Sequence, residues 1–194
     1  MNILPFYELQ LPELVSDVRK IFNSHLYPNA QPDFDLDSIL RVCFFKQGES
    51  GFEEMNAIVK KYPFLMRHAV VWRLPENYET AIRLDGIDNS RRKASCSILI
   101  DAEPDSIKTE FYKVNPEDFY IQQEIRARLI IDNSPAEKVG EFTLKDLPVI
   151  TNTQHPLRDC NRSNAPAFVV SWTVNIEWTW DTVVDNVKKY INTK

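Results

Sequence analysis

A succession of short strand-like segments, each followed by turn residues, limits what most of this 194-residue chain can form. The pattern begins near residue 67. Its turns are rich in proline, asparagine, aspartate and glycine, as at residues 75–77 and 85–90. Short strands at intervals of roughly ten residues favour an antiparallel sandwich or barrel over a parallel sheet. We expect strands at residues 70–74, 80–84, 94–100, 109–114, 141–144, 148–151 and 167–176.

Helical patterns flank these strands on both sides. Apolar residues recur at helical spacing over residues 12–25, 52–61 and 181–191, and a further short helix is expected over residues 36–45. Between residues 115 and 139 no single pattern dominates, and residues 125–131 fit either a strand or a helical turn. We therefore predict one α+β domain over 1–194, with a helical N-terminal region (1–65), a β core (66–176) and a C-terminal helix (177–194).

Composition and charge exclude several classes of protein. Apolar residues make up 43% and charged residues 26% of the chain, as in ordinary globular domains, and the net charge is −5. This negative charge gives no electrostatic reason to expect nucleic-acid or membrane binding. No apolar run reaches the roughly 20 residues of a membrane span, and the N-terminus has no signal-peptide pattern. With three cysteines at wide spacing, read as reduced thiols, we expect a cytoplasmic protein.

Two segments carry more information than their strand patterns. The first is RLPENYETAIRLDG at residues 73–86, continuing through RRKASCSILI at 91–100. The second is LPVITNTQHPLRDCN at residues 147–161, which leads to FVVSW at 168–172. Together they resemble a phage-type family of iron(II)/2-oxoglutarate dioxygenases, related to the aspartyl/asparaginyl and prolyl hydroxylases. The resemblance covers about residues 70–172 and implies a double-stranded β-helix, that is, a cupin-like jelly roll.

The resemblance also implies which positions would hold iron and cosubstrate. Such enzymes bind iron through two histidines and one carboxylate, and an arginine binds the far carboxylate of 2-oxoglutarate. The metal positions fall on Arg83, Asp85 and Leu157, and the cosubstrate arginine position falls on Ala167. An arginine stays protonated and leucine has no ligand atom, so the metal site is degenerate. We expect no cofactor.

Each candidate residue has two readings. Arg83 and Asp85 lie two apart in a strand, so they either share an inward face as an ion pair or are two solvated charges. His155 is the one candidate for a rescuing metal ligand, although a surface role is the more common one for a histidine in a loop. A candidate anion-binding set at the barrel mouth comprises Arg91, Arg92, Asn152 and Arg158, and the alternative for Arg91 and Arg92 is an exposed turn.

The leading hypothesis is a non-catalytic binding or structural protein, a pseudoenzyme, that binds a protein partner or a small anionic ligand. The phage-type resemblance implies an accessory or virion protein in the host cytoplasm. The alternative is an active iron(II)/2-oxoglutarate hydroxylase with an atypical metal site, which would need both iron and 2-oxoglutarate. A sugar- or nucleotide-binding jelly roll of the cupin kind is a third reading, which rests on the shared architecture alone.

Overall fold

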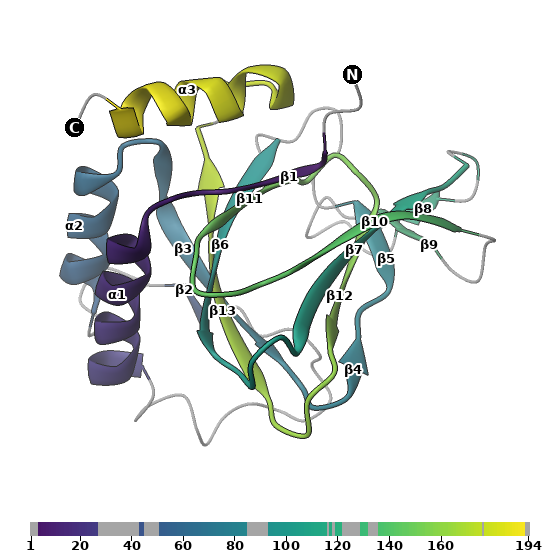
Figure 1. The fold of residues 1–194 in the computed structure, drawn as a ribbon, viewed down its shortest axis with the longest axis horizontal. Helices are drawn as coiled ribbons and strands as arrows, with labels where there is room; N and C mark the ends of the chain where they lie inside the picture. The colour runs from purple at the N-terminus through teal and green to yellow at the C-terminus, as the bar shows by residue number, and fades with distance from the viewer. Residues whose placement is uncertain are drawn as a thin grey trace.

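Two curled antiparallel sheets face each other and enclose the interior of the domain (Figure 1). The computed structural model describes residues 4–26, 43–44, 51–84, 93–115, 117, 119–121, 129–131, 136–175 and 177–192, with 25–26, 43–44, 67–68, 119–121 and 129–131 described by their backbone alone. The six-stranded sheet has the order β1-β11-β6-β13-β3-β2. The seven-stranded sheet has the order β10-β7-β12-β5-β9-β8, with β4 paired to β12. This is the predicted α+β jelly roll.

The strands of the six-stranded sheet are β1 (Phe6–Glu8), β2 (Cys43–Phe44), β3 (Leu65–Leu74), β6 (Ala94–Asp101), β11 (Val149–Asn152) and β13 (Ala167–Val174). The other sheet contains β4 (Tyr78–Glu79), β5 (Ile82–Leu84), β7 (Ile107–Lys113), β8 (Phe119–Ile121), β9 (Leu129–Ile131), β10 (Glu137–Thr143) and β12 (Leu157–Asn161). The helices are α1 (Pro12–Ile21), which continues as the π-helical turn η1 (Phe22–Leu26), α2 (Phe52–Lys61) and α3 (Trp180–Asn192).

The six-stranded sheet is buried on both faces. In β6, Cys96, Ile98 and Ile100 belong to an apolar cluster that includes residues of the three helices, whereas Leu99 belongs to a second cluster between the sheets. Strand β13 follows the same alternation, with Trp172 toward the helices and Val169 toward the other sheet. Because successive side chains of a strand point to opposite faces, these near-continuous apolar strands require cover on both sides.

Three parts of the chain differ from the sequence-based expectation. The N-terminal region is not purely helical, since Phe6–Glu8 forms β1 and pairs with β11 at the edge of the sheet. The helix expected over residues 36–45 is wrong at its end, because Cys43–Phe44 pairs with β3 as a strand, and its other residues lie outside the described chain. Strand β12 was not predicted, because its inward side chains include Asp159 and Asn161 and no apolar alternation results.

Other features agree more closely or fill gaps in the prediction. In the uncertain stretch, Phe119–Ile121 and Leu129–Ile131 form the paired strands β8 and β9. Trp180 begins α3 and is partly buried against the helix-side cluster, as Trp178 is. Two cysteines, Cys96 and Cys160, are fully buried free thiols. Within the described residues no helix is long and apolar enough to cross a membrane.

Candidate functional site

The pairing of β5 with β12 brings together two positions that the sequence places 74 residues apart. Arg83 lies directly opposite Leu157 in the antiparallel register. Both side chains are buried and both line a cavity between the two sheets. The two positions that the resemblance assigns to metal-binding histidines therefore lie side by side, as a shared metal site would require, but neither residue can bind a metal. Their assignment to a metal site stays a prediction.

Arg83 is held by polar partners in the interior. Only 6% of its side chain is exposed, so it is not a solvated charge at a strand end. Its Nη1 donates to the hydroxyl of Thr80 at 2.5 Å, and its Nη2 forms an ion pair with the Asp159 carboxylate. A buried guanidinium without such partners would be strongly destabilising, so this arrangement is what makes an inward Arg83 tolerable.

Asp159 is itself fixed by its neighbours. Its Oδ1 accepts a hydrogen bond from the Thr109 hydroxyl at 2.6 Å, and its backbone N–H donates to the Thr80 hydroxyl at 3.0 Å. The sequence-based reading paired Arg83 with Asp85, which lies outside the described residues. Asp159, Thr80 and Thr109 were missed, because only the pairing of β12 with β5 and β7 brings them to Arg83. In the sequence, only the polar residues of the segment that forms β12 could have indicated a carboxylate that faces the interior.

The cavity beside this pair has a volume of about 50 Å³. At about 10 to 15 Å³ for each water, it has room for a few water-sized groups. Its lining residues are Trp72, Leu74, Arg83, Ser95, Ser97, Thr109, Phe142, Leu144, Thr151, Leu157, Asp159, Val169 and Ser171. Ala167, the predicted cosubstrate position, is fully buried opposite Leu74 and belongs to the same apolar cluster as Leu157, but does not line the cavity.

The remaining predicted residues are spread over several places. His155 lies in the turn before β12, with its ring edge-on to Phe111 at 5.6 Å and Nδ1 at 3.3 Å from the Pro156 carbonyl oxygen. Asn152 ends β11, and its side-chain oxygen accepts the N–H of Gln154, which shapes that turn. Arg91 and Arg92, like Asp85, fall outside the described residues, so their anion-binding role stays a prediction.

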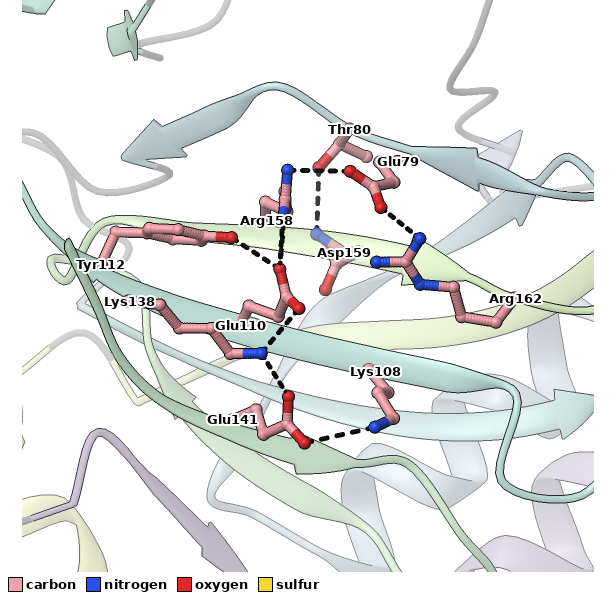
Figure 2. A network of polar contacts seen from close by, with 10 residues as sticks. All are labelled: Glu79, Thr80, Lys108, Glu110, Tyr112, Lys138, Glu141, Arg158, Asp159 and Arg162. Carbon is pink, nitrogen blue, oxygen red and sulfur yellow. Dashed lines mark hydrogen bonds and ion pairs between the residues drawn. The ribbon is translucent and has the colours of Figure 1, made fainter. Parts of the chain in front are cut away.

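Arg158 lies on the outer face of the seven-stranded sheet, away from the cavity lining (Figure 2). Its Nη2 lies 2.6 Å from a carboxylate oxygen of Glu110, and its Nη1 lies 2.8 Å from one of Glu79. Two carboxylates therefore already oppose its charge. The structure does not place it with Arg83 at one anion site.

A chain of alternating charges continues across that outer face (Figure 2). Lys138 bridges Glu110, at 2.8 Å, and Glu141. The Tyr112 hydroxyl also donates to Glu110 at 2.6 Å. Burial alone would raise the pKa of Glu110, but hydrogen bonds from Lys138, Tyr112 and Arg158 outweigh it and lower the pKa to about 2. This network fixes the strand pairing β7–β10 and β7–β12 from outside.

Iron does not fit the residues at the family positions. Arg83 is protonated and engaged with Asp159, Leu157 has no donor atom, and Ala167 cannot bind a carboxylate. Across the described part of the chain, no cluster of three or more histidine, cysteine, aspartate or glutamate side chains is arranged to hold a metal ion.

Comparison with solved structures identifies the class of fold. A prolyl-4-hydroxylase from Pseudomonas putida is similar with a TM-score of 0.51 and 11% identity, over 88% of this chain and 92% of that chain. EvdO2 from Micromonospora carbonacea var. aurantiaca gives a TM-score of 0.48 at 14% identity, over 88% and 86% of the two chains. A Trichoplax adhaerens prolyl hydroxylase, in complex with a hypoxia inducible factor peptide fragment, gives 0.45 at 11% identity, over 91% and 86%.

The likeness to the Pseudomonas putida structure supports a dioxygenase-like double-stranded β-helix, and at 11% identity it shows the fold alone. The chain matches no protein-family model and no curated protein sequence. Function must therefore be argued from the residues of the interior.

Proposed function

We propose that this chain is a non-catalytic binding or structural protein built on a dioxygenase-like jelly roll. One observation carries the proposal: the two adjacent positions where the resemblance expects histidines hold Arg83, ion-paired to Asp159, and Leu157. The guanidinium supplies a fixed positive charge inside the barrel. A divalent cation beside it would meet electrostatic repulsion and would lack two of its three ligands.

The Arg83–Asp159 pair supports a structural role for these residues. It links the Thr80 hydroxyl near β5 to β12, and through Thr109 it reaches β7. Three segments of the seven-stranded sheet are thus joined through Arg83, which stands at a position where the resemblance implies a metal-binding histidine. As a binding protein, the chain would present its barrel to a protein partner or a small ligand. The phage-type resemblance makes an accessory or virion protein the biological setting of this proposal.

The test is turnover of 2-oxoglutarate. The full chain is incubated in air with iron(II), ascorbate and 2-oxoglutarate, and succinate is measured by NMR. We expect no succinate beyond that formed by iron and ascorbate without protein. Turnover that disappears in the Asp85→Ala or His155→Ala variant would show a working atypical metal site and would overturn the proposal. Turnover that neither substitution changes would mark a contaminating activity.

A further inference from the structure

Four hydroxyl-bearing side chains of the six-stranded sheet line the cavity, beside the apolar side chains of Trp72, Leu74 and Val169. Ser97 of β6 lies opposite Ser171 of β13, and their Oγ atoms are 2.8 Å apart. Ser95 of β6 lies opposite Thr151 of β11. These four side chains line the space between the sheets, where the same strands also place apolar residues such as Val169 and Val149. A hydroxyl-lined wall inside a jelly-roll core needs a physical reason.

Two of these hydroxyls, on Ser95 and Thr151, border the cavity and have no hydrogen-bond partner among the described residues. Ser95 is 6% exposed and Thr151 is 5% exposed, and neither side chain forms a hydrogen bond with any residue that the structure describes. Hydroxyls that are mostly removed from bulk solvent are hydrogen-bonded to water or a ligand in native proteins. Both hydroxyls border the cavity, which places the missing partner there.

The opposite wall combines Arg83, Thr109 and Asp159 with apolar residues, and its described residues carry no net charge. Arg83 and Asp159 are the charged groups among the described lining residues, and they form an ion pair with each other. A dianion such as 2-oxoglutarate would find one guanidinium already matched by a carboxylate. A neutral molecule that both donates and accepts hydrogen bonds would meet complementary groups on both walls.

Apolar lining residues add a second requirement. Trp72 and Leu157 border the same space and would contact carbon-bound hydrogens. A cavity of about 50 Å³ holds about three to five water-sized groups. We infer that the cavity is a binding site for a small neutral polyol of the size of glycerol, with its hydroxyls toward Ser95, Thr151 and the Arg83–Asp159 pair. This inference rests on the proposed function, since iron and a dianionic cosubstrate would compete for the same interior.

The test is an NMR titration of the full chain with glycerol, with succinate as the charged comparator. We expect saturable shifts of the Thr109 and Thr151 methyl signals in the millimolar range of glycerol, and none with succinate. The Thr151→Val variant keeps the side-chain shape and removes one hydroxyl, so it should bind glycerol about tenfold more weakly. Thr143→Val, on β10 away from the lining, should bind like the unaltered chain.

Three results would overturn the inference: no saturable shift with glycerol, equal binding by the Thr151→Val variant, or tighter binding of succinate. The first would mean that ordered water alone satisfies the hydroxyls. Iron-dependent succinate production would instead refute the proposed function. The absence of both glycerol binding and iron chemistry would refute the cavity assignment alone, so the two failures are distinguishable.

Discussion

Separating Arg83 from Asp159 should destabilise the domain more than any surface ion pair does. The side chains are 6% and 24% exposed, so both charges lie mostly out of water. The Arg83→Met substitution leaves the Asp159 carboxylate inside with the Thr109 hydroxyl as its remaining side-chain donor among the described residues, and Asp159→Asn removes the carboxylate that pairs with the guanidinium in the described part of the chain. Removing one partner of a buried pair costs about 3 to 5 kcal/mol, and the partial exposure of Asp159 favours about 3 kcal/mol for each variant.

The double variant, Arg83→Met with Asp159→Asn, tests whether the two groups act as a unit. It removes both charges, so its loss should be about 4 kcal/mol, below the sum of the single losses, with a coupling of about 2 kcal/mol. The free energy of unfolding is measured by urea denaturation monitored by circular dichroism. The matched control is the exposed Lys145–Asp105 pair, with side chains 63% and 69% exposed.

For the control pair, substituted as Lys145→Met and Asp105→Asn, the coupling should stay below about 0.5 kcal/mol. Asn is chosen at position 105 because this residue has a positive φ of 57°, which asparagine adopts readily. Additive losses at Arg83 and Asp159, or single losses as small as those of the control, would refute the interpretation that the pair replaces a metal site as an internal structural link.

Three further predictions concern the outer network, the β12 turn and the thiols. The pKa of Glu110 is lowered to about 2 in the folded protein, so the free energy of unfolding should fall by roughly 3 kcal/mol as the pH drops from about 4.5 toward 2. The Glu110→Gln variant should lack this acid-dependent loss. A pH profile of stability that the substitution leaves unchanged would contradict the prediction. Asn161 is fully buried, and its side-chain amide donates to the backbone carbonyls of residues 74, 75 and 165. The Asn161→Asp substitution should therefore lower the free energy of unfolding in urea by at least about 3 kcal/mol. Asn164→Asp, on the exposed side of the same turn, should be nearly neutral. Burial raises the pKa of the Cys96 thiol to about 12 and that of the Cys160 thiol to about 11. A Cys43→Ser variant, which keeps only these two thiols, should therefore react with Ellman's reagent at pH 8 only after unfolding. Rapid labelling of the folded variant would show that the thiols are accessible.

The sequence predicted elements whose signal is local. Helix α1 follows from Leu14, Val18 and Ile21 at helical spacing, and β6 from a run of residues buried on both faces. Strand β1 was missed because three residues are too few to show alternation. Strand β12 was missed because its inward positions are polar, and polar inward positions have no apolar period to reveal them.

The candidate site divides in the same way. The resemblance assigns Arg83 and Leu157 to one metal site, and the structure places them opposite each other, a proximity that local residue patterns do not reveal. The partner of Arg83 was not anticipated, because Asp159 lies 76 residues away and is selected by strand register. The hydroxyl wall was also hidden, since Ser95, Ser97, Thr151 and Ser171 read as ordinary strand residues until β6, β11 and β13 lie side by side.

The most direct test of the central claim is an anaerobic titration of the full, unaltered chain with iron(II), in the presence of 2-oxoglutarate, monitored by calorimetry. With Arg83 engaged by Asp159 and Leu157 beside it, we expect no stoichiometric iron binding tighter than micromolar. One iron bound per chain at submicromolar affinity, with the charge-transfer absorption of a chelated 2-oxoglutarate, would contradict the account.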